Sequence, residues 1–144
     1  FPRGLTLARD LVDHKYDFSF SGLKTAVSRY LAKTPNHLRA DVAASFQEAV
    51  VDVLLMKAIG AAIESGIETL IIAGGVAANS RLRELASERT AQAGIQLRIP
   101  PMDLCTDNGA MVAAIGSLAV AKGLKPSQIG FAADSSSGIS KPIF

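Results

Sequence analysis

The sequence predicts an α/β fold, in which strands and helices alternate along the chain. Two short apolar segments, residues 69–73 and 95–99, have the length and composition of strands. Each is followed by glycine or proline residues and then by a longer segment suited to a helix. Because each connection contains a helix, we expect the two strands to pair in parallel.

The N-terminal part of the chain predicts a loop, a strand and a helix. Residues 1–16 show no steady hydrophobic period and predict a loop. Residues 16–21 alternate aromatic with small polar residues, which is typical of a half-buried strand. After Gly22, apolar residues recur at helical spacing, and we expect this helix to end before Pro35.

Residues 38–65 predict the longest helix of the chain. Five apolar residues share one helical stripe: Val42, Phe46, Val50, Val53 and Leu54. Beyond Leu54 the segment is almost entirely small and apolar, so we expect its second half to be covered on several sides. Gly66 is the expected C-terminal cap. The helix is therefore predicted to be a buried, central one.

Two further helices are expected, one after each apolar strand. The first spans residues 79–93 with Asn79 as its N-cap, because asparagine side chains accept hydrogen bonds from free helix amides. The second spans residues 106–122, with Thr106 or Asp107 as the expected cap.

The composition excludes several classes of protein. The 144 residues include 15 Lys and Arg against 13 Asp and Glu, and this balance excludes strong counterion-driven nucleic-acid binding by the segment alone. With 49% hydrophobic residues the chain is not disordered in composition. No apolar run approaches the roughly 20 residues of a transmembrane helix. The single Cys105 and the lack of a secretion signal predict a reducing, cytoplasmic compartment.

The two ends of the chain also carry expectations. The chain starts at Phe1 without an initiator methionine, and we expect it to be a piece of a longer protein. Residues 124–144 are rich in serine, glycine and proline and predict an irregular tail.

The segment from Gly74 and Gly75 to Asn79 is the first candidate site. Without Cβ atoms the backbone at the two glycines can approach a ligand closely, and the amides of the following helix lie nearby. A nucleotide could bind there. A third spaced glycine and a Gly-Lys-Ser or Gly-Lys-Thr sequence are missing, so neither the dinucleotide fingerprint nor a Walker loop is present. The alternative is a plain tight turn with a helix cap.

Asp107 is the second candidate and lies in the next connection between strand and helix. Ligands of open α/β sheets bind at the carboxyl ends of strands, and a carboxylate oxygen suits a divalent metal. The alternative is an N-cap aspartate. His14 and His37 lie too far apart in sequence to form a helical pair, so most histidine ligands, if a metal site has any, must come from outside the chain.

Ser19, Ser21 and Lys24 form the third candidate. Two hydroxyls on one side of a strand and a basic residue at a helix start could hold a phosphate or carboxylate. The alternative is that all three side chains face solvent.

Three arginines and one cysteine complete the candidates. Arg81, Arg83 and Arg89 could contact RNA phosphate, although exposed arginines more often serve solubility. Cys105 is expected to be a small packing residue.

Three motifs occur in register along the chain: DFSFSGLKT at residues 17–25, AGGVAANSRLR at 73–83 and LCTDNGAM at 104–111. In this order and separation they closely resemble the C-terminal half of the tRNA adenosine threonylcarbamoyltransferase family, bacterial TsaD, long labelled O-sialoglycoprotein endopeptidase. The resemblance covers nearly the whole chain.

The resemblance implies the actin/Hsp70/sugar-kinase-like (ASKHA) fold, with two α/β lobes and a nucleotide cleft. Residues 1–144 would form mostly the C-terminal lobe, and the N-terminal lobe would be absent. The implied reaction transfers threonylcarbamoyl from threonylcarbamoyl-AMP to the adenosine 3′ of the anticodon, in tRNAs that read codons starting with A. The implied partners are tRNA, the bacterial proteins TsaB and TsaE, and a TsaC-type enzyme that supplies the adenylate. No membrane is involved.

The resemblance also implies roles for individual residues. The family binds one divalent metal, iron or zinc, through Asp107 and two histidines of an N-terminal His-x-x-x-His helix that this chain lacks. Asn79 would contact the adenylate beside Gly74 and Gly75. Other residues implied to line the same cleft are Ser19, Ser21 and Lys24. Because the histidines are missing, we expect the 144 residues alone to bind metal weakly and to be inactive.

Two alternatives stay open beside this interpretation. Another nucleotide-dependent transferase of the same fold, such as a sugar kinase or a hydrogenase-maturation carbamoyltransferase, could share the lobe; the segment 106–108 argues against the kinase. A non-catalytic partner subunit of the same fold is the second alternative, and the presence of Asp107 and Asn79 argues against it. No protease constellation supports the old peptidase label.

Overall fold

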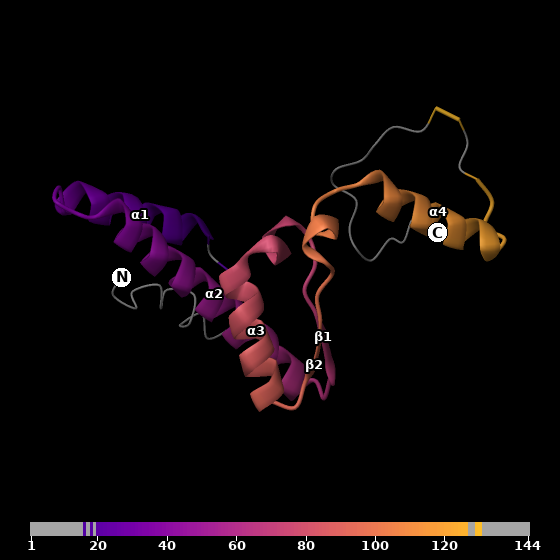
Figure 1. The fold of residues 1–144 in the computed structure, drawn as a ribbon, viewed down its shortest axis with the longest axis horizontal. Helices are drawn as coiled ribbons and strands as arrows, with labels where there is room; N and C mark the ends of the chain where they lie inside the picture. Colours follow the sequence, from indigo (N-terminus) through magenta and orange to yellow (C-terminus); the bar gives the residue numbers. More distant parts are fainter. Residues whose placement is uncertain (1–15, 17, 19, 127–128, 131–144) are drawn as a thin grey trace. The chain divides into compact units, whose positions relative to one another are not determined.

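The computed structural model describes residues 16, 18, 20–126 and 129–130, with the side chains of residues 20 and 21 left out of the description. The chain divides into two units, Phe1–Cys105 and Thr106–Phe144, and each is described by itself. The elements in chain order (Figure 1) are α1 (Phe20–Lys33), α2 (Arg39–Glu64), β1 (Thr69–Ile71), the 3₁₀ helix η2 (Gly75–Ala78), α3 (Ser80–Gln92), β2 (Gln96–Arg98), the 3₁₀ helix η3 (Met102–Leu104) and α4 (Gly109–Ala121).

The two strands form a parallel sheet, as the sequence predicts. Leu70 lies opposite Leu97, and Ile71 lies opposite Arg98. The Ile72 amide donates to the Arg98 carbonyl at 3.0 Å and continues the ladder beyond β1. The α/β class of the chain is therefore confirmed for the described residues.

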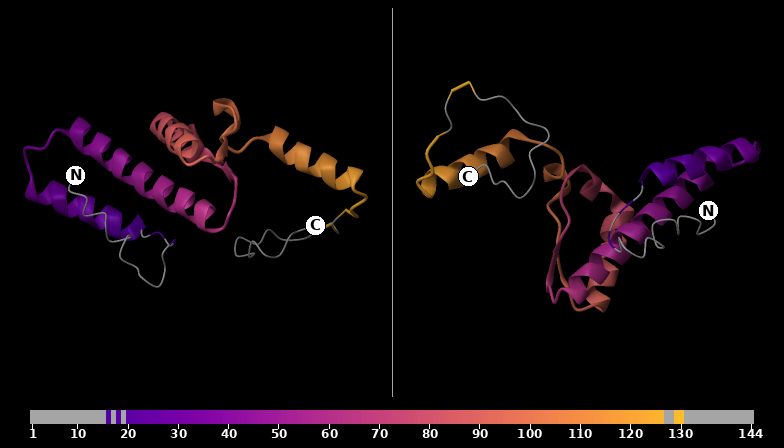
Figure 2. Two further views of the ribbon diagram at one scale, coloured as in Figure 1. Left: turned by 90° about the horizontal axis from the view of Figure 1, so that it is seen from below. Right: turned by 180° about the vertical axis from the view of Figure 1, so that it is seen from behind.

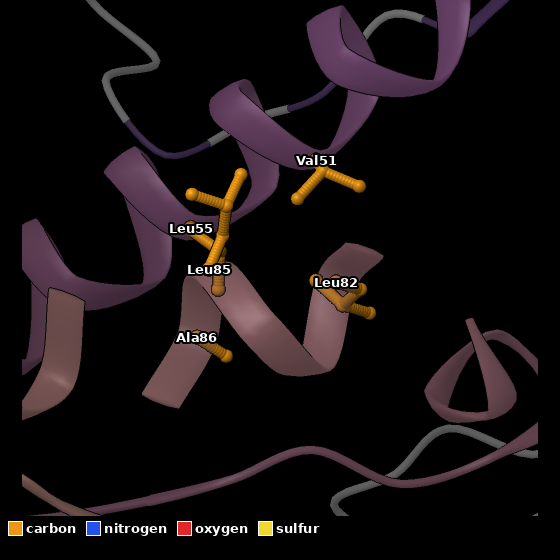
Figure 3. Packing of buried hydrophobic residues seen from close by; sticks show 5 residues of the cluster. All are labelled: Val51, Leu55, Leu82, Leu85 and Ala86. Carbon is orange, nitrogen blue, oxygen red and sulfur yellow. The ribbon is translucent and has the colours of Figure 1, made fainter. Parts of the chain in front are cut away.

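The core lies between α2 and α3, beside the sheet. Figure 3 shows five buried side chains gathered between the two helices. They are Val51 and Leu55 from α2, and Leu82, Leu85 and Ala86 from α3. Partly buried residues from α2 and the strand segments pack against them: Ile59, Ile72, Leu97 and Ile99. Burying this apolar surface is the main stabilising contribution to the first unit.

The sheet is covered on one face within the first unit. Ile72 and Leu97 pack against the core, whereas the side chain of Ile71, which precedes Ile72 in the chain, is 67% exposed. The reason is geometric, because successive side chains of a strand point to opposite faces and α2 and α3 supply one layer only.

Glycine ends the long helix α2 as expected. Gly66 has φ of +64°, a left-handed conformation that glycine adopts without a Cβ clash. The Ile67 amide donates to the Ala62 carbonyl at 2.8 Å, and the Gly66 amide donates to the Ile63 carbonyl at 3.2 Å. This pair of bonds is a Schellman motif, which satisfies the last carbonyls of the helix.

The expected strand at residues 16–21 is wrong. α1 begins at Phe20, so Phe20 and Ser21 are helical, while residues 17 and 19 lie outside the described part. An alternation of only six residues is a weak strand signal. The helical spacing that includes Leu23 and Val27 belongs to a helix that begins at Phe20, inside the last two residues of the expected strand. The loop expected before residue 16 also lies outside the described residues.

α2 is the longest described helix, but the face it buries differs from the expected stripe. Its buried residues are Val51, Leu55, Lys57 and Ala62. Phe46 from the expected stripe is 38% exposed, and Ile63 in the second half is 60% exposed. Tertiary packing decides which face of α2 is buried, because α3 packs against the face that carries Val51 and Leu55. α2 is therefore not buried all round within the described residues.

α1 and α2 run in opposite directions and are joined by the turn near Pro35 (Figure 2). The helix expected to end before Pro35 is confirmed by α1. None of the helices in the described residues is both long and apolar enough to cross a bilayer. Most of the predicted tail, residues 127–128 and 131–144, lies outside the described part.

Candidate functional site

The segment from Gly74 to Asn79, called the glycine turn below, connects β1 with α3. Gly74 has φ of +86° and ψ of 178°, a region that is essentially restricted to glycine. The Ala77 amide donates to the Gly74 carbonyl at 2.9 Å and closes the 3₁₀ turn of η2. Gly74 and Gly75 are both exposed, and a Cβ added at either would meet no atom within 4 Å. The turn therefore presents bare backbone to open space.

Asn79 is the N-cap of α3, as the sequence predicts. Its Oδ1 accepts a hydrogen bond from the Leu82 amide at 3.0 Å. Its Nδ2 donates to Oε1 of Gln47 on α2 at 3.4 Å. A carboxamide can make up to four hydrogen bonds, so a ligand could still be contacted through the second Nδ2 hydrogen or the second Oδ1 lone pair. The side chain is thus fixed at the start of α3, beside the turn.

Arg83 contacts the same turn from within α3, and sequence reasoning missed this role. Its Nε donates to the Ala77 carbonyl at 2.6 Å. Its Nη2 donates to the Pro100 carbonyl at 2.5 Å and to Sγ of Cys105 at 3.1 Å. Cys105 is buried, which confirms it as a packing residue. No sequence signal could have revealed these partners, because they meet only in the folded chain.

The other two arginines of α3 also have protein partners. Arg81 pairs with Glu48 and with Glu84, each at 2.7 Å. Arg89 pairs with Asp52 of α2 at 2.8 Å. Neither RNA contact nor mere solubility is needed to explain them, because these pairs link α3 to α2 or to its own next turn.

The ion pair between Arg81 and Glu48 shifts the pKa of both side chains. The hydrogen bond from Arg81, more than its charge, holds the pKa of the Glu48 carboxyl below its ordinary value. The same hydrogen bond raises the pKa of Arg81 further above its already high value. Both side chains remain substantially exposed to solvent, so the pair contributes modestly to stability.

Asp107 is the second residue of the second unit and is exposed. It is not the cap of α4, and neither is Thr106, which corrects that expectation. Asn108 is the cap, because its extended backbone places Oδ1 to accept from the Met111 amide at 2.9 Å. For Asp107 to be the cap, α4 would have to begin at Asn108, but it begins at Gly109. The Asp107 carboxylate is therefore not used in capping the helix.

The described residues contain no group of three His, Cys, Asp or Glu side chains that could hold a metal. His37 lies in the turn between α1 and α2, with Nδ1 at 2.6 Å from the Thr34 carbonyl, and His14 lies outside the described part.

Residues 1–114 match the sequence profile of a family described as tRNA N6-adenosine threonylcarbamoyltransferase, TsaD. The chain belongs to this family. A curated relative of that name from Corynebacterium diphtheriae is 51% identical over 148 residues. The match covers 99% of this chain and 42% of the relative, so the chain spans less than half the relative's length.

In this TsaD-family chain the serine-rich motif does not form the expected strand. Ser19 lies outside the described part, and only the backbone of Ser21, in the first turn of α1, is described. Lys24 is exposed and lines a groove of about 940 Å³ between α1 and α2. The apolar residues of that groove are Leu23, Val27, Leu31, Val42, Ala43 and Phe46. The structure thus places Lys24 beside an apolar groove, and the proximity expected for the three residues stays a prediction.

Proposed function

We propose that this chain is the C-terminal part of a two-lobed, ASKHA-type transferase that modifies tRNA. The reaction transfers threonylcarbamoyl from threonylcarbamoyl-AMP to the exocyclic amine of the adenosine 3′ of the anticodon, in tRNAs that read codons starting with A. A C–N bond forms to the carbamoyl carbon, its bond to the phosphate oxygen breaks, and AMP leaves with the electron pair while the amine loses a proton. Family membership and the name of the relative support this reaction.

The observation that carries the proposal is the open glycine turn at the start of α3. Gly74 and Gly75 have open space in front of them, and the first amides of a helix have no acceptor within that helix. These amides and the positive end of the helix dipole favour an anion such as the phosphate of the adenylate. We assign the turn to the nucleotide portion, with the Asn79 carboxamide as a further contact. Ser19, Ser21 and Lys24 are proposed to line the same cleft.

Asp107 is the proposed metal ligand of this chain. Its exposed carboxylate is a hard oxygen donor that no helix cap uses, which fits a divalent metal completed by two histidines from outside the chain. Iron, with zinc as the alternative, would supply Lewis-acid polarisation of the carbamoyl carbonyl when bound. The 144 residues alone, which lack those histidines, are proposed to bind metal weakly and to be inactive.

The proposed assembly contains tRNA as substrate and the bacterial proteins TsaB and TsaE as partners. A TsaC-type enzyme supplies the adenylate, and the reaction takes place in the cytoplasm. The name of the relative includes tRNA adenosine, which supports tRNA as the substrate.

Gly75→Ala in the full-length transferase tests the proposal. The added methyl group meets no protein atom, and Gly75 does not have a positive φ, so the melting temperature should stay close to that of the wild type. Calorimetry should show AMP binding weakened by about tenfold or more, because the methyl group intrudes on the ligand. Nucleoside mass spectrometry should show a matching loss of threonylcarbamoyladenosine.

Gly60→Ala is the matched control, since Gly60 lies within α2 and an added Cβ there also meets no atom within 4 Å. It should bind AMP like the wild type and should be stabilised by about 0.5–1 kcal/mol. Unchanged AMP affinity in Gly75→Ala would overturn the assignment of the turn.

A further inference from the structure

Arg83 joins three backbone segments that are separate in the sequence. Its guanidinium donates to the carbonyl of Ala77 in η2, to the carbonyl of Pro100 after β2, and to the Cys105 thiol after η3. Ala77 is fully buried and Cys105 is 3% exposed, so two of the three contacts end on well-packed residues. All four residues belong to the first unit.

The contacts use the particular shape of an arginine side chain. A guanidinium is planar and holds its N–H groups in fixed directions, so Nε and Nη2 can serve acceptors on different segments at once. A lysine ammonium concentrates its donors on one atom and cannot reproduce this fork. Hydrogen bonds from a charged donor are also stronger than neutral ones.

Arg83 ties the glycine turn to two other segments of the first unit. Ala77 lies in the turn that starts at Gly74, Pro100 follows β2, and Cys105 follows η3. A single side chain therefore restrains the turn assigned to the nucleotide.

We propose that Arg83 is a positioning residue of the nucleotide site, which fixes the shape of the glycine turn. The inference rests on the proposed function. Residues that orient ligand-binding groups from behind affect affinity without touching the ligand. Arg83 would thus act on nucleotide binding through the shape of the turn.

Arg89 provides a matched control on the same helix. It is also half-buried, and its Nη2 donates to Oδ1 of Asp52 at 2.8 Å, but it contacts α2 and not the turn. Loss of Arg89 should destabilise the packing of α3 on α2 and leave the glycine turn in place.

The test compares Arg83→Met, Arg83→Lys and Arg89→Met in the full-length transferase. Hydrogen exchange of peptides covering residues 74–79 and 100–105 should accelerate in both Arg83 variants and stay unchanged in Arg89→Met. AMP affinity should fall by about tenfold or more in Arg83→Met. Hydrogen exchange and AMP affinity of each protein are measured at the same number of degrees below its own melting temperature. Differences in overall stability then do not account for differences between the variants.

Unchanged exchange in Arg83→Met, or an equal loss of affinity in Arg89→Met, would overturn the inference. Full recovery of AMP affinity by Arg83→Lys would also overturn it, because charge alone would then suffice. If the wild type binds no AMP, the proposed function fails, and the nucleotide-site role of Arg83 fails with it. If the wild type binds AMP and Arg83→Met binds it equally well, only the inference fails.

Discussion

Oδ1 of Asn79 accepts a hydrogen bond from the Leu82 amide at 3.0 Å, so the residue proposed to contact the adenylate is also the cap of α3. The two roles can be separated because they use different parts of the carboxamide. The cap requires one side-chain oxygen, whereas a ligand contact can use Nδ2.

Asn79→Ala removes both roles and Asn79→Ser removes only one. Asn79→Ala should lower the free energy of unfolding by about 1 kcal/mol, because an N-cap is lost, whereas serine caps helices well and should preserve it. Both variants should weaken AMP binding in calorimetry. Wild-type AMP affinity in Asn79→Ser would contradict the ligand contact, and wild-type stability in Asn79→Ala would contradict the cap.

Leu55→Ala tests the core between α2 and α3. Leu55 is 1% exposed, so its truncation should cost about 2–5 kcal/mol through lost burial and the cavity left behind. Urea denaturation followed by circular dichroism measures the loss. Leu38, which is 69% exposed, is the control, and Leu38→Ala should change stability by less than about 0.5 kcal/mol. Equal effects of the two substitutions would show that the core is misplaced.

Glu48→Gln tests the pair formed by Arg81 and Glu48. Arg81 lowers the pKa of Glu48 in the folded chain, so the pair stabilises the protein above the unfolded carboxyl value of about 4.3. This contribution is lost as the pH falls through the lower, folded pKa. The melting temperature of the wild type should therefore fall more between pH 7 and pH 3 than that of Glu48→Gln.

The difference should be small, and it should shrink further at high salt because the pair is exposed. Glu68→Gln serves as the control, since Glu68 is an exposed glutamate outside this pair. A Glu48→Gln variant with the same pH dependence as the wild type would argue against the pair.

The elements that the sequence predicted correctly depend on local chemistry. Gly66 ends α2 and Asn79 starts α3 because glycine conformation and a capping bond act over a few residues. The parallel pairing of β1 and β2 follows from the helix between them. These features need no knowledge of the rest of the fold.

The errors arise where local patterns are ambiguous or where packing decides. The alternation at residues 16–21 fits a strand as well as a helix start, and α1 extends into it. Three adjacent polar residues could each have capped α4, and Asn108 does. The buried face of α2 depends on where α3 lies, and Arg83 finds acceptors on segments that only the fold brings together.

Asp107→Ala in the full-length transferase tests the central claim most directly. The side chain is exposed and caps no helix, so its loss should change stability by less than about 0.5 kcal/mol. Asp103→Ala, at an exposed aspartate in η3, is the matched control and should keep wild-type metal content and activity. With the partner proteins present, Asp107→Ala should retain less metal by mass spectrometry and form no threonylcarbamoyladenosine on tRNA. Normal metal content and normal tRNA modification in Asp107→Ala would contradict the account.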